Sequence, residues 1–98
     1  MRINYDDAAR EEESEAAEWY GKQQKTLQTR FLAKWKDAEN RMLASPRIHR
    51  CFEGDLRKCW FEVFPYTLVF HIREDELRVI AVMPMSRRPG YWKGLAGS

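Results

Sequence analysis

The chain has 98 residues, of which 44% are hydrophobic and 33% charged, so its composition is that of one globular domain and not of a disordered segment. Its net charge is only +2, which gives a far weaker positive field than a typical basic nucleic-acid-binding domain has. No run approaches the roughly 20 apolar residues of a membrane span, and no secretory signal precedes the first polar residues. We therefore expect a cytoplasmic protein that has reduced thiols and does not contact a membrane.

The first predicted elements are a short strand and an acidic helix. Apolar and polar side chains alternate over residues 1–6, which predicts a half-buried strand. The Glu- and Ala-rich run after it predicts a helix over residues 8–21. An aspartate, Asp6 or Asp7, is the expected N-cap, and Gly21 is the expected end of the helix.

The second predicted helix, residues 24–44, has the strongest helical pattern in the chain. Its large apolar residues recur every three or four positions, as in a helix that faces a core; they are Leu27, Phe31, Trp35, Ala38 and Met42. We expect the helix to end before Pro46, because the residue before a proline avoids the helical region. The short connection to the first helix predicts an antiparallel helical hairpin.

Three apolar runs in the second half of the chain predict strands over residues 56–64, 66–73 and 77–85. The polar stretch before them, residues 47–55, is expected to be a loop. The connections between the strands are too short for crossovers, so the strands are expected to form an antiparallel meander. Their centres are apolar on both faces, which indicates central strands covered by helices on one face and partly covered on the other.

These elements together predict an α+β fold. An N-terminal strand, an antiparallel helical hairpin and a three-stranded antiparallel meander would pack as a helix pair on a twisted sheet of about four strands. The N-terminal strand has to return to an edge of that sheet after the hairpin.

A basic and aromatic tail, residues 86–95, follows the last predicted strand. Its side chains are of the kinds that grip phosphates and stack on bases: Arg87, Arg88, Tyr91, Trp92 and Lys93. A second basic group surrounds the start of the first strand of the meander: Arg47, Arg50, Arg57 and Lys58. The two groups could line one concave face and hold a scissile phosphate. The alternative is that the arginines are solvated and that the tail aromatics pack on the core.

The sequence has no nucleotide loop, nucleophile elbow or metal-binding motif, and we expect neither a metal nor a cofactor. Its two cysteines, Cys51 and Cys59, lack the additional ligands of a zinc site and are expected to be free thiols. His71 lies in the middle of a predicted strand, where a structural role is expected. His49 lies beside two arginines in the polar loop and is a candidate acid or base.

The order of elements, together with four short motifs, resembles the RelE/ParE superfamily of bacterial type II toxins over nearly the whole chain. The motifs are residues 16–20 (AAEWY), 31–32 (FL), 64–66 (FPY) and 87–92 (RRPGYW). The resemblance implies a growth-inhibiting toxin of a toxin–antitoxin system, of the kind linked to plasmid stabilisation. It also implies a cognate antitoxin that covers the toxin's helices and sheet, and contact with operator DNA only through that antitoxin.

The resemblance implies two different targets. RelE-like members cut mRNA on the ribosome with basic residues of the sheet and a C-terminal tyrosine, whereas ParE-like members bind DNA gyrase. If the chain is a ribonuclease, the resemblance assigns the catalytic role to Arg57, Lys58, Arg87 and Tyr91. Two further cations of a ribonuclease are replaced here, by Trp60 and Thr67.

Three hypotheses follow. The missing cations and the low net charge favour a toxin that inhibits gyrase by protein–protein contact, without catalysis, and that uses the tail residues Arg87, Arg88, Tyr91, Trp92 and Lys93. The alternatives are a ribosome-dependent mRNA endonuclease and an inactive or structural relative. The sequence does not identify the antitoxin-binding residues.

Overall fold

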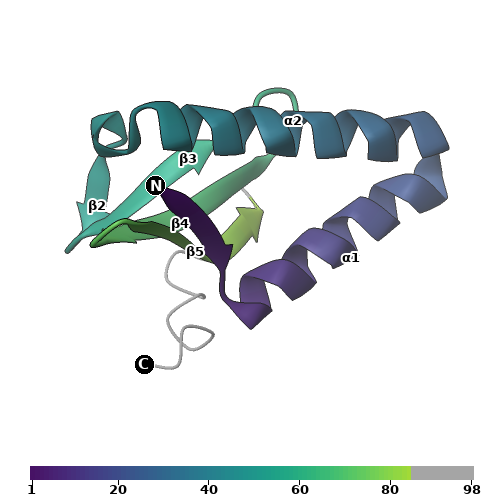
Figure 1. Ribbon diagram of the computed structural model, residues 1–98. Helices are drawn as coiled ribbons and strands as arrows, with labels where there is room; N and C mark the ends of the chain where they lie inside the picture. The colour runs from purple at the N-terminus through teal and green to yellow at the C-terminus, as the bar shows by residue number, and fades with distance from the viewer. Residues whose placement is uncertain (85–98) are drawn as a thin grey trace.

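Within residues 1–84, which the computed structural model describes, the chain forms a helical hairpin on one face of a five-stranded mixed sheet (Figure 1). The elements in chain order are β1 (Arg2–Tyr5), α1 (Asp7–Gln23), α2 (Lys25–Ala44), the 3₁₀ helix η1 (Pro46–Ile48), β2 (Cys51–Glu53), β3 (Leu56–Trp60), β4 (Tyr66–Arg73) and β5 (Glu76–Pro84). The sheet order is β1-β5-β4-β3-β2, in which β1 lies parallel to β5 and all other neighbours are antiparallel. The predicted α+β fold and the edge position of the N-terminal strand are confirmed.

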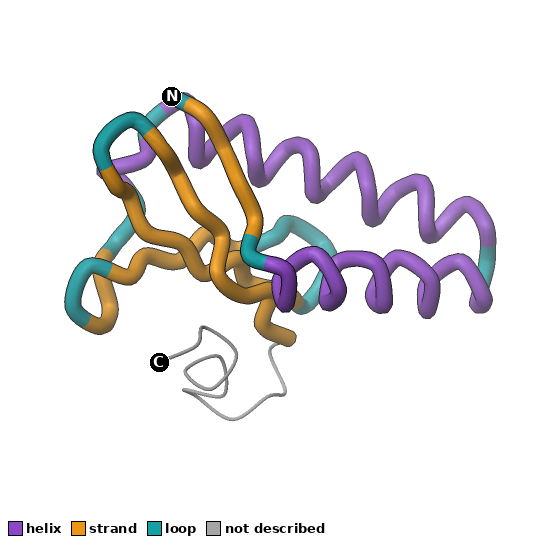
Figure 2. The backbone as a smooth tube through the Cα atoms, turned by 60° about the horizontal axis from the view of Figure 1, so that its bottom comes forward, coloured by secondary structure: helices purple, strands orange, loops and turns teal. Residues whose placement is uncertain are grey.

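The two helices meet at Gln24 and diverge from there, as Figures 1 and 2 show. The predicted end of the first helix at Gly21 is wrong, because α1 continues to Gln23. Gly21 instead allows close contact between the helices: a Cβ there would lie 3.0 Å from the side chain of Gln28 on α2. The Gln28 side chain also donates a hydrogen bond to the Ala17 carbonyl of α1 at 3.1 Å. No helix within residues 1–84 is long and apolar enough to cross a bilayer.

The apolar stripe of α2 faces the sheet, as its spacing predicts. Phe31, Trp35, Ala38 and Met42 are buried. Phe31 lies at the centre of an aromatic cluster built from α1, α2, the segment after β3 and the start of β4; its ring centroid is 5.1–5.5 Å from those of Tyr20, Phe61, Phe64 and Tyr66. This cluster joins the hairpin to the sheet.

Strand β3 ends at Trp60, earlier than the predicted residue 64. The next residues leave the sheet because Phe61 and Phe64 both turn into the core. A strand would place these two side chains on opposite faces. Val63 between them is 69% exposed and has a φ of 75°, which is unusual for a β-branched residue.

The predicted loop over residues 47–55 is partly wrong, because it contains η1 and β2. Strand β2 pairs with β3 across a tight turn at Gly54, whose φ is +57°. The strand has only three residues, of which Phe52 alone is a large apolar residue, so its sequence has no alternating pattern. It adds a fifth strand to the four that the sequence predicts.

A bulge in β5 determines which side chains face away from the helices. Val69 of β4 pairs with Ala81, whereas Phe70 pairs with Val79, so Ile80 is the extra residue. The side chains of Val69, Ile80, Ala81 and Met83 form a second buried cluster, separate from the core beneath the helices. Both faces of the central strands therefore contain buried apolar residues, as the sequence predicts.

Candidate basic and aromatic pocket

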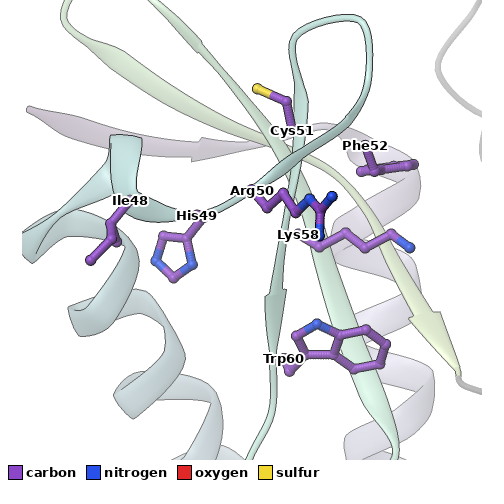
Figure 3. A pocket seen from close by; sticks show the side chains of 7 residues that line it. All are labelled: Ile48, His49, Arg50, Cys51, Phe52, Lys58 and Trp60. Carbon is purple, nitrogen blue, oxygen red and sulfur yellow. The ribbon is translucent and has the colours of Figure 1, made fainter.

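The candidate site is a pocket of about 640 Å³ at the edge of the sheet farthest from β1. Its lining residues come from the linker after α2, from β2 and from β3 (Figure 3); they are Ile48, His49, Arg50, Cys51, Phe52, Lys58 and Trp60. This volume is within the range of small-molecule sites. Of the residues that the sequence singles out, the structure brings Lys58, Arg50, His49 and Cys51 to this pocket.

Side-chain alternation along β3 places Lys58 and Trp60 on the pocket side. Cys59 between them is buried in the core under the helices. The Lys58 ammonium lies 4.4 Å from the ring centroid of Phe52 and 5.8 Å from that of Trp60. Figure 3 shows the lysine chain extending between these two rings. Cation–π attraction holds the ammonium there.

The pocket contains two cations whose charge is not neutralised by a described neighbour. Within residues 1–84, neither Lys58 nor Arg50 forms an ion pair. None of the described residues that line the pocket is acidic. The pocket therefore has a local positive potential that the net charge of the whole chain does not reveal.

His49 lies at the inner side of the pocket and contacts the core. Its ring packs edge-on against Phe70, with centroids 5.6 Å apart, and Nε2 is 3.5 Å from the Arg41 carbonyl. These contacts hold the imidazole at the end of α2 and against the core. His49 remains a candidate acid or base, because its side chain still lines the pocket.

Arg57 has a different environment from its neighbour Lys58. Its guanidinium donates hydrogen bonds to the Arg47 carbonyl at 3.1 Å and to the His49 carbonyl at 2.7 Å. Arg57 therefore fastens the linker that presents His49 and Arg50, and it does not line the pocket. Its predicted catalytic role stays a prediction.

The two positions at which the family resemblance implies cations in a ribonuclease lie opposite each other in the sheet. Trp60 of β3 pairs with Thr67 of β4. Trp60 is 49% exposed, whereas Thr67 is completely buried. The exposed member of the pair is thus a tryptophan, at the position where the family resemblance implies a lysine in a ribonuclease.

The predicted target-binding residues, Arg87, Arg88, Tyr91, Trp92 and Lys93, lie outside the described residues. The same holds for the catalytic candidates Arg87 and Tyr91, and for the whole tail 86–95. Whether they adjoin the pocket stays a prediction.

Sequence reasoning misses the contribution of Phe52, because it misses β2. The signal that could have found this strand is the Gly54–Asp55 pair between two short runs, since Gly-Asp is typical of a two-residue hairpin turn. The sequence pattern marks Trp60 only as the replacement of a lysine. Its position beside Lys58 and Phe52 shows it to be part of the pocket.

The remaining groups that could react are the two cysteines and His71. Both cysteines are free, as predicted; Cys51 is exposed, and its sulfur points away from the other labelled side chains in Figure 3. Burial raises the pKa of the Cys59 thiol and keeps it protonated. Burial first, and then Arg73, lowers the pKa of His71, which is consistent with a neutral structural residue.

Comparison with known proteins identifies a related fold. No family model matches the sequence, and no curated protein matches it. Among solved structures, the chain is similar to one described as "Chromosomal ParDE TA system from P. aeruginosa", with a TM-score of 0.65 and 11% identity. The match covers 88% of this chain and 97% of the other. The chain therefore has the fold of a chain from a ParDE TA system.

Proposed function

We propose that this protein is the toxin of a type II toxin–antitoxin system and is neutralised by a cognate antitoxin. The observation that carries the proposal is the structural match to a ParDE TA system, which extends over nearly all of both chains. The four motifs that resemble RelE/ParE toxins add independent support, because they come from the sequence and not from the fold. Operator DNA is then contacted only through the antitoxin.

The proposed target is DNA gyrase, inhibited by protein–protein contact. Support comes from residues 1–84, in which some of the cations that the family resemblance implies for a ribonuclease are absent. Trp60 and Thr67 replace two of them, and the Arg57 guanidinium is bound to two backbone carbonyls. Loss of a single group that stabilises transition-state charge costs roughly 3–4 kcal/mol, so a site that lacks several is a poor catalyst. The tail residues Arg87, Arg88, Tyr91, Trp92 and Lys93 are proposed to contact the target.

A ribosome-dependent mRNA endonuclease is the second candidate. The observation that favours it is the pair Lys58 and Arg50, which line a pocket that has no acidic side chain among its described lining residues. In this case Arg57, Lys58, Arg87 and Tyr91 would have the catalytic roles that the family resemblance implies. His49, held at the same pocket, would be available for proton transfer.

Two parallel assays separate these targets. We expect the purified protein to inhibit supercoiling by gyrase and to trap cleaved DNA, and we expect a double variant, Tyr91→Ala with Trp92→Ala, to lose this inhibition. Trp19→Ala is the matched control, because Trp19 is an exposed tryptophan on α1. Unchanged gyrase activity, with codon-phased cleavage of mRNA on translating ribosomes, would overturn the gyrase target in favour of the endonuclease.

A further inference from the structure

We propose that the face of the sheet opposite the helices is a docking surface for the chain's own C-terminal segment, residues 85–98, through the rings of Tyr91 and Trp92. The surface is the second apolar cluster of the sheet, which consists of Val69, Ile80, Ala81 and Met83. The sequence leaves open whether the two rings pack on the protein or contact a partner, and this apolar surface favours packing in the free protein.

The cluster lies on the face of the sheet that the helices leave uncovered. When helices cover one face of a sheet, the other face usually has polar side chains, because it is in contact with water. Here Val69 of β4 and Ala81 of β5 are paired across the sheet, belong to the cluster away from the helices, and are completely buried. Ile80 and Met83 beside them are at most 9% exposed. Such burial requires a layer that covers the cluster.

Described apolar side chains can cover only one side of the cluster. The partly buried apolar residues that pack against it are Phe52 of β2 and Leu56 of β3. Strand β4 separates β3 from β5, so β5 lies about 10 Å from β3. Phe52 and Leu56 can therefore cover the cluster from the side of β4. The buried side chains of β5 require a further segment.

The C-terminal segment has the length and the sequence to be this cover. It begins directly after Pro84, the last residue of β5, and Met83 of the cluster is the residue before. The chain from Pro84 to Tyr91 can span up to roughly 23 Å, which is enough to return over the neighbouring strands. Pro89 and Gly90 lie between them and favour a turn, because proline and glycine suit its two central positions.

The small size of the cluster favours a tethered segment over a second copy of the chain. The cluster has four side chains, whereas a stable interface between proteins involves roughly 20–30 residues on each side. One buried aromatic side chain accounts for about 150–250 Å² of surface, so two rings suffice here. The tether also gives the segment an effective concentration on the order of millimolar, so that even a weak contact is occupied.

Docking would regulate the tail, a consequence that rests on the proposed gyrase target. Tyr91 and Trp92 are among the residues that are proposed to contact gyrase, and rings that are packed on the sheet cannot contact a partner at the same time. Gyrase would therefore have to displace the rings from the sheet. The charged residues Arg87, Arg88 and Lys93 can remain in water, where such side chains are usually found.

The test measures thiol reactivity in the full chain that carries Cys51→Ser and Val69→Cys. The first substitution removes the exposed thiol, and the second places a small apolar thiol in the cluster. Cys59 is an internal control, because it is buried in the core under the helices. We expect the introduced thiol to react slowly with an aromatic disulfide reagent, because the segment covers it.

Removal of the two rings should uncover the introduced thiol. Tyr91→Ser together with Trp92→Ser should accelerate its reaction about tenfold or more and leave Cys59 unchanged. Arg87→Ser together with Arg88→Ser is the matched control, since it changes the same segment without removing a ring. This control should leave the reaction slow.

Four results would overturn the docking proposal. They are a fast reaction of the introduced thiol in the full chain, an unchanged reaction after loss of the rings, an equal acceleration of Cys59, which would show that the whole fold is loosened, and protection that increases with protein concentration, which would assign the surface to a second copy. Because these measurements use the free protein, they do not depend on the toxin function.

A separate measurement tests the regulation. Added gyrase should accelerate the reaction of the introduced thiol, because it draws Tyr91 and Trp92 away from the sheet. An introduced thiol that stays protected while gyrase is inhibited would overturn the competition between the two contacts. Absence of gyrase inhibition would instead count against the proposed target and leave the docking result intact.

Discussion

At the scale of single residues, Phe31 carries more of the packing than any other side chain of α2. It is fully buried, and its ring contacts aromatic residues from α1, α2 and the segment after β3. A smaller side chain at this position would leave a cavity and would lose these edge-on and stacked ring contacts.

We predict that Phe31→Ala lowers the free energy of unfolding by about 3–5 kcal/mol, because it leaves a large cavity. Urea unfolding measures this as a lower midpoint with an unchanged slope. The neighbouring substitution Leu32→Ala is the control. Leu32 is 44% exposed, so its truncation should change stability by only about 0.5 kcal/mol. Equal effects of the two substitutions would contradict the packing described for α2.

Tyr5 connects β1 to α2 through polar contacts. Its hydroxyl donates to the Glu39 carboxylate at 2.5 Å and accepts from the Trp35 indole at 2.6 Å. Burial first, and then the hydrogen bond to Glu39, raises the pKa of the Tyr5 hydroxyl well above its usual value near 10. The folded protein therefore retains this proton at a pH where the unfolded chain has lost it.

This shift predicts a loss of stability at alkaline pH. The stabilisation is complete below about pH 10, the tyrosine pKa of the unfolded chain, and it decreases as the pH rises above that value. Urea unfolding at a series of pH values should show a shallower decrease for Tyr5→Phe than for the wild type. Some decrease should remain, since burial also raises the pKa of Tyr20. Identical slopes for variant and wild type would show that Tyr5 does not titrate in this way.

At the scale of elements, two features protect the exposed edge of β5 from pairing with a strand of another chain. β1 pairs only with residues Glu76 to Val79 of β5, so the second half of β5 has no neighbouring strand on that side among the described residues. There the Val82 amide donates to the Glu12 carboxylate of α1 at 2.9 Å. Pro84, at the end of the strand, has no backbone N–H group that could donate a hydrogen bond to another strand. A helix carboxylate and a proline thus discourage pairing with another chain.

We predict that Glu12→Ala loosens this edge. Loss of the carboxylate costs about 1–2 kcal/mol locally and should accelerate hydrogen exchange of the Val82 amide about tenfold. Glu11→Ala removes the same charge from an exposed neighbouring position and should leave the exchange rate unchanged. Equal exchange in both variants would mean that the carboxylate does not protect the strand.

The sequence predicts the long elements well and the short ones poorly. The predicted α2 and β4 agree with the structure to within a residue, because their patterns extend over many positions. The three-residue strand β2 has no such pattern, and Gly21 serves contact between helices instead of ending one. β3 ends early because Phe61 and Phe64 both enter the core, which depends on tertiary packing and not on local propensity.

At the scale of the whole molecule, the sheet separates two surfaces with different chemistry. The helical hairpin covers one face and forms the main core, whereas the basic and aromatic pocket lies at the β2–β3 edge (Figures 1 and 3). Basic residues near β3 could be predicted from the sequence. The different roles of these basic residues could not be predicted, because Arg57 binds the linker while Lys58 lies against Phe52 and Trp60. This difference between Arg57 and Lys58 depends on the alternation of side chains along β3 and on a β2–β3 pairing that the sequence pattern does not reveal.

The most direct test of the central claim is the growth of bacteria after induction of this protein, alone or together with the cognate antitoxin that we propose. We predict that induction alone arrests growth and that co-expression of the antitoxin restores it and yields a stable complex of the two. Normal growth at high levels of folded protein would contradict the proposal that this chain is a toxin.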